Sequence, residues 1–292
     1  MMEGLLNSAA PLMLAGLGAL LTDLSGTLAI FIEGFMISGA FFSWIFAGWT
    51  GSVFWGTLFS ALLAAFCGWA LARFVRLSGA NPFVAALALN LAASGITLSL
   101  QALVFGTKGV LLNQAIKVPL PVIIPLIDDI PVLGKIISGN DPFAYTAFIC
   151  VFIIALILKR TVPGLRLRSS GLSPEAAAER GIRPGFYMEA AWAIAAFLAA
   201  LSGSALTFRL GVYAPGGIAG RGWIALAIVY LGFRKPWGVA LAAIIFSIAE
   251  RLGYGFQSLG ALPATVLLGF PAALALVFYF VAMVLKRSGS PR

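Results

Sequence analysis

The chain has 292 residues, of which 61% are hydrophobic and only 10% are charged, whereas about a quarter of the residues in a soluble domain are charged. This composition excludes a soluble globular protein and predicts a polytopic membrane protein. The net charge of +9 is spread over short connections between apolar runs and has no aromatic-basic pattern, so we expect the lipid bilayer and no nucleic acid as partner.

Eight apolar runs are long enough to cross a hydrocarbon core of about 30 Å as helices, and they lie at residues 5–21, 27–47, 52–72, 82–105, 142–158, 185–207, 236–250 and 263–285. A shorter run, 222–233, follows the glycine-rich stretch APGGIAGRG and is too short to cross alone. It is typical of half a broken helix or of a re-entrant segment. We therefore predict one transmembrane domain over 1–292, all-α, with about 8–10 membrane helices including broken or re-entrant ones.

The basic residues predict the orientation of the chain in the membrane. Arg73 and Arg76, the stretch from Lys159 to Arg183, the pair Arg234 and Lys235, and the basic tail all face the cytoplasm under the positive-inside rule. The N-terminus and a proline-rich loop near 106–141 then lie on the extracytoplasmic side. That loop is either a docking surface for an extracytoplasmic partner or a plain connector, and the sequence leaves both open.

Glu33 lies deep in the second apolar run, where an ionisable group is costly and needs an explanation. One interpretation is a carboxylate that faces a transport pathway, with the neighbouring rings of Phe31 and Phe35 as candidate contacts for a ligand. The other is a structural carboxylate that bonds exposed backbone where Gly26 and Gly34 flank a helix interruption, and the sequence favours this one. Thr22 and Asp23 are expected to cap the helix that follows them.

A polar stripe follows Asn81-Pro82, where Asn90, Ser94 and Thr97 recur at helical spacing on one face. Such a stripe either bonds a neighbouring helix or lines a polar pathway. The amide of Asn90 favours the pathway, whereas Ser94 and Thr97 are more typical of helix packing.

Residues 163–183 form a polar, basic island within an otherwise apolar sequence. Pro174 stands where the first turn of a short helix begins, and Ser173 precedes it as the N-cap. We predict an amphipathic helix near 173–182 on the cytoplasmic face. A transport channel needs such a helix if a separate soluble motor is to push on it, whereas a self-contained carrier does not.

Two glycine-interrupted apolar segments, 26–40 and 211–232, have the pattern of broken helices that form solute sites near the midplane of transporters. One hypothesis that follows is a secondary transporter driven by an ion gradient, with Glu33 as the titrating group. An enzyme is not expected, because the chain has no histidine and no convergent acidic pair in its apolar runs. Cys67 and Cys150 lack metal-site spacing, so no metal site is predicted.

Four stretches together carry a resemblance that covers most of the chain: AAPLMLAGLGALLTDLSGTLAIFIEGFMISGAF, NPFVAALALNLAASGI, GLRLRSSGLSPEAAAERGI and GGIAGRGWIALAIVYLGFRKPWGVALAAIIFSIAERLG. They resemble the permease subunits of bacterial ABC importers in the ribose and branched-chain amino acid superfamily. Within it the chain is most similar to nucleoside uptake permeases that work with basic-membrane-protein-type lipoproteins. The resemblance implies the fold of type II ABC importer permeases, in the bacterial cytoplasmic (inner) membrane.

The resemblance also implies roles for individual residues. Pro174, Glu175, Ala176 and Ala177, followed by Gly181, look like the coupling loop of the family, whose helix docks into a groove of the ATPase subunit. Gly181 would end that helix in a left-handed cap. The family's acidic motif near Glu33 and its asparagine segment at Asn90 have counterparts here, which makes both residues candidates for the substrate pathway.

The implied partners are an ABC ATPase subunit, a second permease subunit in a heterodimer or a homodimer, and an extracytoplasmic substrate-binding lipoprotein. The chain has no GxxxxGK[ST] motif, so ATP and Mg would be held by the ATPase and no cofactor by this chain. A nucleoside is the implied substrate, with riboflavin, a sugar or a branched-chain amino acid as alternatives.

Overall fold

The computed structural model describes residues 4–28, 30–112, 116, 118–122, 138–218 and 220–258. These residues form the helices α1 (Leu5–Leu24), α2 (Ile32–Thr50), α3 (Val53–Ser78), α4 (Pro82–Phe105), α7 (Pro142–Arg160), α8 (Val162–Leu172), α9 (Pro174–Glu179), α10 (Pro184–Leu210), α11 (Arg221–Leu231) and α12 (Pro236–Ser258). Seven of them are long and apolar enough to cross a membrane, and α11 is a shorter apolar helix. The all-α polytopic fold is confirmed, and the predicted span 263–285 lies outside the described residues.

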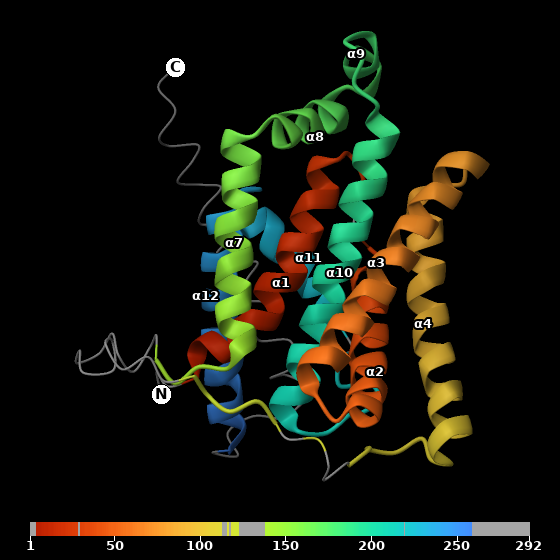
Figure 1. Ribbon diagram of the computed structural model, residues 1–292. Coiled ribbons are helices and arrows are strands. Elements are labelled where there is room, and N and C mark those ends of the chain that lie inside the picture. Colours follow the sequence, from red (N-terminus) through yellow and green to blue (C-terminus); the bar gives the residue numbers. More distant parts are fainter. Residues whose placement is uncertain are drawn as a thin grey trace.

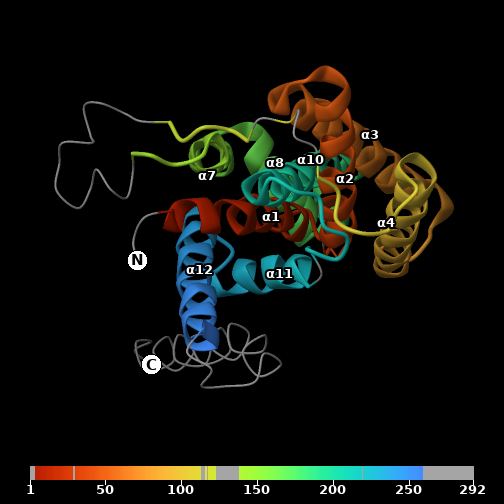
Figure 2. The same ribbon diagram turned by 90° about the horizontal axis from the view of Figure 1, so that it is seen from below.

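Two helices, α1 and α10, form the centre of the bundle, and 83% of the apolar window of each is buried. They pack against each other, while α2 and α3 cover α10 on one side and α7, α11 and α12 cover α1 on the other. Figure 2 shows α4 at the outer edge, beside α3. Only 17% of α4 is buried. Apolar composition is therefore similar in all spans, but the surroundings differ from protein interior to exposed surface.

Small residues set the close crossings within this bundle. Gly39 of α2 packs on the backbone of Ala200 in α10, and Gly34 packs on Asn90 of α4. A Cβ at Gly34 would come within 2.8 Å of Asn90 Oδ1 and 3.1 Å of Asn90 Cα. Gly34 and Gly39 thus admit a neighbouring backbone, as small residues do where membrane helices pack closely.

At one end of the bundle, α8 lies across from α7 to α10, and α9 projects beyond it (Figure 1). Proline occupies the first turn of α4, α7, α8, α9 and α10, where its missing N–H costs no hydrogen bond. Side chains of Asn81, Thr161 and Ser173 cap α4, α8 and α9. The short helix starting at Pro174 is confirmed, but the polar island contains a second helix, α8, that the sequence interpretation missed.

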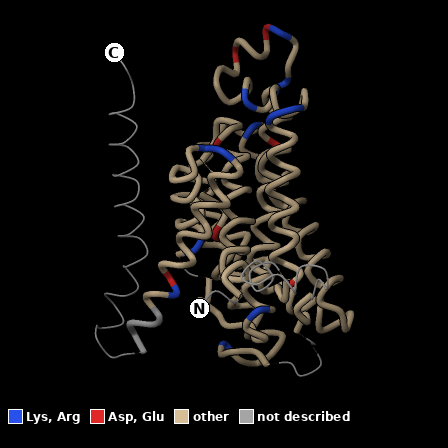
Figure 3. Tube along the Cα trace, turned by 90° about the vertical axis from the view of Figure 1, so that its left-hand side faces the viewer, with Lys and Arg blue, Asp and Glu red and all other residues tan. Residues whose placement is uncertain are grey.

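Most of the described Lys and Arg residues lie at the α8–α9 end, which carries several of the blue segments at the top of Figure 3. Arg73, Arg76 and Arg183 line one hollow there, while Lys159 and Lys235 line another. The three described groups that the positive-inside rule assigned to the cytoplasm therefore share one end of the molecule. We call this the basic end.

The described residues between α1 and α2 (25–28, 30 and 31) and between α10 and α11 (211–218 and 220) are irregular, and we call these two interruptions of the bundle the first and the second break. The second predicted span begins too early, because α2 starts only at Ile32, and Gly34 lies inside the first turn of α2 instead of flanking the break. Thr22 and Asp23 do not cap the following helix either. They lie in the last turn of α1, where the Thr22 hydroxyl donates to the carbonyl of Ala19.

Candidate functional site

The two irregular segments meet at Glu33. Its Oε1 atom accepts a hydrogen bond of 2.9 Å from the backbone N–H of Gly220, which is the N-cap of α11. Gly222, one residue into α11, packs directly on Cα and Cβ of Glu33, a contact that only glycine permits. Glu33 also lies in the first turn of α2. The carboxylate is thus next to the amino ends of two helices, where a negative charge is stabilised.

Helix length places this junction within the membrane. With 11 residues, α11 is about 16 Å long, roughly half of the hydrocarbon thickness. Its carboxyl end is followed by Arg234 and Lys235 at the basic end. Glu33 and Gly220 at its amino end therefore lie near mid-depth. The backbone hydrogen bond that the sequence favoured for Glu33 is present, although its donor belongs to the second break and not to the first.

Asn90 of α4 joins the first break from the side. Its Oδ1 accepts from the N–H of Gly34 at 2.7 Å, and its Nδ2 donates to the carbonyl of Ile30 at 2.7 Å. The N–H of Gly34 is one of the first-turn donors that have no partner within their own helix. The Asn90 amide therefore acts as a cap for α2, supplied from another helix.

A cavity of about 360 Å³ opens beside this junction, between α2, α4, α11 and the 211–220 segment. Its polar and aromatic lining consists of Glu33, Asn90, Ser94, Thr97, Tyr213 and Trp223. All three residues of the predicted polar stripe face it, although the hydroxyls of Ser94 and Thr97 also bond carbonyls of their own helix. The volume lies within the range of about 300–1,000 Å³ typical of sites for small molecules.

Glu33, one of the residues that line this cavity, carries an acceptor atom without a partner in the described part of the chain. Its Oε2 atom is buried and has no hydrogen-bond partner among the described residues. A buried polar atom without a partner costs free energy, so such an atom at the edge of a cavity is suited to a ligand that donates a hydrogen bond. The described part of the chain contains no group of three acidic or cysteine side chains that could hold a metal ion.

Phe31 and Phe35 are placed differently from Glu33. Both are buried in the core, and Phe31 packs with a centroid distance of 4.6 Å on Trp192 of α10 and 5.6 Å on Phe35. Neither side chain lines the cavity. The structure brings Glu33 and Asn90 together in the cavity lining, whereas the two phenylalanines lie in the core, outside that lining.

Two rings of the cavity were missed by the sequence interpretation. Tyr213 is held by a pair of backbone hydrogen bonds to Leu111, of 2.8 and 3.1 Å, which tie the connection between α10 and α11 to the chain after α4. Trp223 is half exposed on α11. Their positions beside the glycine-rich stretch were the available signal. An ion pair between Arg221 and Glu250, at 3.6 Å, was missed too, because nothing in the sequence relates residues on α11 and α12.

At the basic end, α9 presents the residues of the predicted coupling segment. The Ser173 hydroxyl accepts from the N–H of Ala176 at 3.4 Å, and Gly181 follows the helix with a φ of 75°, in the left-handed conformation expected of it. Pro174, Glu175, Ala176 and Gly181 are exposed, whereas Ala177 is buried against the rest of the chain. Ala176 is therefore the small residue of the pair that is open to a partner.

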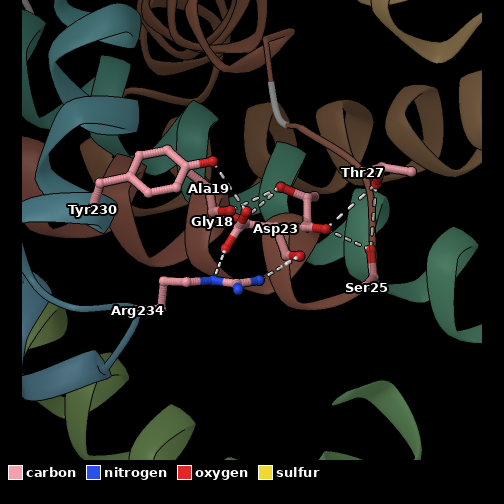
Figure 4. A network of polar contacts seen from close by, with 8 residues as sticks. Gly18, Ala19, Asp23, Ser25, Thr27, Tyr230 and Arg234 are labelled. Carbon is pink, nitrogen blue, oxygen red and sulfur yellow. Dashed lines mark hydrogen bonds and ion pairs between the residues drawn. The ribbon is translucent and has the colours of Figure 1, made fainter. Parts of the chain in front are cut away.

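Contacts connect this end to the cavity through the first break. Gly171 of α8 packs on the backbone of Leu24 and Gly26, and the indole N–H of Trp192 donates to the Thr27 hydroxyl at 2.7 Å. Figure 4 shows the end of α1 in this region, with Asp23 as its centre. Phe31, four residues after Thr27, is the last residue before α2. A displacement of α8 would thus act on the segment that positions Glu33.

Asp23 also ties the carboxyl end of α1 to the turn between α11 and α12. Its carboxylate accepts from Arg234 Nε at 2.6 Å and from the Tyr230 hydroxyl at 3.3 Å (Figure 4). Phe233 and Arg234 both have positive φ angles, of 53° and 55°, which cost free energy in residues other than glycine. The ion pair offsets part of that cost by holding the turn against α1.

Comparison with known proteins gives a consistent result. Residues 1–286 match the family described as branched-chain amino acid transport system / permease component. The guanosine ABC transporter permease protein NupQ of Bacillus subtilis is 34% identical over 262 residues, which cover 84% of this chain and 78% of that protein. The nucleoside ABC transporter permease protein NupC of Lactococcus lactis is 31% identical over 83% of this chain and 78% of its own length.

A third relative carries a different substrate in its name. The putative glucose ABC transporter permease protein TsgC13 of Haloferax volcanii is 29% identical over 88% of this chain and 78% of that protein. No solved structure matches the chain.

Proposed function

We propose, from the premise that the chain belongs to the branched-chain amino acid transport system / permease component family, that it is the membrane subunit of an ATP-driven importer for nucleosides. The cavity beside Glu33 binds the solute, and α9 binds the ATPase subunit that drives transport. The observation that carries the proposal is the unbonded Glu33 Oε2 at a mid-depth cavity between two broken helices, in a chain whose relatives include guanosine and nucleoside permeases.

The chemistry of the cavity suits a nucleoside. The carboxylate oxygen of Glu33 accepts hydrogen bonds, which the N–H groups of a nucleobase or the hydroxyls of a ribose supply. Tyr213 and Trp223 offer ring surface on which a base can stack. Asn90 holds the backbone around the site, and its carbonyl oxygen has a second lone pair for the solute. Phe31 and Phe35 support the site from behind.

The coupling proposal concerns α9. An ABC ATPase subunit, which holds ATP and Mg, binds the exposed face of Pro174, Glu175 and Ala176, and its closure displaces α8 and the break at 25–31. A second permease subunit, related or identical, covers the open side of the cavity. An extracytoplasmic binding lipoprotein delivers the solute to the end opposite α9, and the assembly lies in the bacterial cytoplasmic membrane.

The test is uptake by the purified assembly. The tagged chain is isolated with its partners in mild detergent, the partners are identified by mass spectrometry, and the complex is reconstituted with its binding protein in liposomes loaded with ATP. We expect an ATPase with a Walker motif to copurify and radiolabelled guanosine to accumulate only with ATP. Glucose and leucine in excess should not compete. Competition by glucose alone would instead assign the site to a sugar.

One alternative function has an observation in its favour. The unbonded oxygen of Glu33 at mid-depth is also suited to carrying a proton or binding a cation in an ion-coupled secondary transporter. This alternative predicts uptake by the chain alone, abolished by an ionophore and indifferent to ATP. The same liposomes distinguish the two, because ATP-dependent uptake that persists in the ionophore contradicts ion coupling.

The coupling role of α9 is tested by Glu175→Arg. Glu175 is exposed in the first turn of α9, so its replacement removes no buried contact, and the guanidinium repels a basic, donor-bearing partner surface that the carboxylate would bind. We expect the complex to assemble while solute-stimulated ATP hydrolysis and uptake fall at least tenfold. Arg160→Glu, a reversal of charge at the same end but outside α9, is the matched control. Normal uptake with intact stimulation in Glu175→Arg would contradict the docking role.

A further inference from the structure

We propose that this chain binds the phosphate headgroup of an anionic phospholipid in a second cavity, at the basic end, between the last turn of α3, the start of α10 and α8. This cavity has a volume of about 700 Å³ and is separate from the cavity at Glu33. Four guanidinium groups line it, from Arg73, Arg76, Arg166 and Arg183. We call it the arginine cavity.

The charges of the arginine cavity do not cancel. Its one carboxylate, Glu189, is buried and accepts a hydrogen bond of 2.6 Å from Arg76 Nε, while Arg73 Nη1 lies 3.7 Å away. Arg166 and Arg183 have no carboxylate within ion-pair distance in the described part of the chain. The arginine cavity thus contains four positive groups and one carboxylate. Guanidinium groups that lack an acid partner are the residues best suited to bind a phosphate by paired hydrogen bonds.

Backbone packing holds one of these arginines in place. A Cβ at Gly185, in the first turn of α10, would come within 2.5 Å of Arg76 Cδ, so the arginine stem crosses α10 where no side chain stands. The buried Glu189, one turn further along α10, then fixes the guanidinium. Arg76 is consequently a preorganised member of the cavity, while Arg166 and Arg183 are exposed at its rim.

The depth of the arginine cavity matches the headgroup layer. With 26 residues, α3 is about 39 Å long, which exceeds a hydrocarbon core of about 30 Å by a few ångströms at each end. Arg73 and Arg76 lie in its last two turns. Basic pockets between transmembrane helices on the cytoplasmic side are where anionic lipid headgroups bind.

Apolar side chains at the edge of the cavity favour a lipid over a soluble anion. Phe186, in the first turn of α10, lines the cavity and is exposed at 63%, and Phe74 and Leu77 in the last two turns of α3 are exposed at 59% and 68%. A free phosphate gains nothing from these apolar side chains, whereas the acyl chains of a lipid cover them. Gly181, which follows α9, is part of the lining, so a partner that binds α9 comes close to the cavity.

The experiment measures lipid binding to the intact chain by native mass spectrometry. The purified chain is titrated with phosphatidylglycerol, with phosphatidylcholine of the same acyl chains, and with phosphatidylglycerol in the presence of inorganic phosphate. The variant is Arg166→Gln with Arg183→Gln, two exposed residues whose replacement leaves no buried charge. The matched control is Arg160→Gln with Arg180→Gln, which removes the same charge at the same end, outside the cavity.

We expect the site of highest affinity to bind phosphatidylglycerol more tightly than phosphatidylcholine. Each basic residue near an anionic lipid contributes about fivefold in affinity, so the double variant should bind it about 25-fold more weakly, with less than a twofold change in the control. Displacement of the lipid by millimolar phosphate would identify the ligand as the free anion and overturn the lipid assignment. Equal losses in the variant and the control, or equal binding of both lipids, would overturn the site itself.

The same titration on the chain bound to its ATPase tests whether the ATPase, and not a lipid, covers the arginine cavity. Retention of the tight phosphatidylglycerol in the complex is the expected result. Its loss on assembly would mean that the motor subunit covers the arginines, and would overturn the proposal for the working transporter. Neither outcome depends on whether the solute is a nucleoside.

Discussion

Replacement of Asn90 by alanine tests whether one side chain holds the first helix break in place. The Asn90 amide satisfies the N–H of Gly34 and the carbonyl of Ile30, each at 2.7 Å. Its removal leaves two backbone groups without partners, and each such buried group costs about 1–3 kcal/mol. Because Asn90 lines the cavity, water can partly replace it, so we expect the lower part of the sum, about 2–3 kcal/mol in the free energy of unfolding.

The assay is a denaturant titration of the purified chain in detergent, followed by tryptophan fluorescence, with uptake measured in parallel. Ser94→Ala is the matched control, because Ser94 lines the same cavity from the next turn of α4 and bonds only the carbonyl of Leu91. Its stability should change by less than about 0.5 kcal/mol. Asn90→Asp should be intermediate, because the carboxylate keeps the acceptor for Gly34 and loses the donor for Ile30.

Gly34→Ala provides an independent perturbation of the same contact. Its Cβ would come within 2.8 Å of Asn90 Oδ1, so it should reproduce the loss seen with Asn90→Ala. The double variant should lose less than the sum of the two, since both act on one interaction. Equal stabilities of Asn90→Ala and Ser94→Ala would refute the reasoning, as would full additivity with Gly34→Ala.

Two further predictions concern charged groups outside the cavity. Asp23→Asn and Arg234→Gln should each reduce the free energy of unfolding by about 1 kcal/mol, a value discounted because the guanidinium is half exposed. Their double-mutant cycle should show coupling between the two residues. Additive losses would mean that the turn at Phe233 holds without the ion pair. Burial raises the pKa of the Asp141 carboxyl above its ordinary value, and Arg209 lowers it in part. The folded state therefore keeps the proton longer than the unfolded state, so this contribution to stability is complete below the unfolded pKa of about 3.9 and is lost as the pH rises through the higher folded pKa. Asp141→Asn should lack this loss in thermal unfolding between about pH 3.5 and 7, and parallel pH profiles of the two proteins would contradict it.

Hydropathy and local start signals predicted much of the fold. The apolar runs located the spans, Asn81-Pro82 and Ser173-Pro174 located helix starts, and the basic residues located one end of the molecule. These features depend on residues close together in sequence. The same signals failed where local cues were ambiguous. Thr22 and Asp23 look like a cap but continue α1, because the Thr22 hydroxyl donates to Ala19 within α1 and the donors to the Asp23 carboxylate come from residues as distant as Arg234.

The cavity could be predicted only in part. Glu33 and Asn90 stood out because polar groups are costly in an apolar run, but their partners, Gly220 and Gly34, follow from tertiary packing. In a membrane protein an apolar ring gives no indication of its surroundings. Phe31 is fully buried while Phe66 is 62% exposed, and both stand in equally apolar runs. The local sequence around Phe31 therefore gave no indication that its side chain is buried in the core.

The central place of α1 has a consequence for how the protein is made. This helix is synthesised before every helix it packs on, and α10, its main neighbour, begins about 160 residues after it ends, a distance of the kind that delays assembly. During insertion α1 must therefore persist in lipid as a single helix. From Leu5 to Thr22 it has no charged residue, which allows this. Biogenesis and the finished structure thus place different demands on the same segment: solubility in lipid first, and tight packing of Gly18 on Ala195 of α10 later.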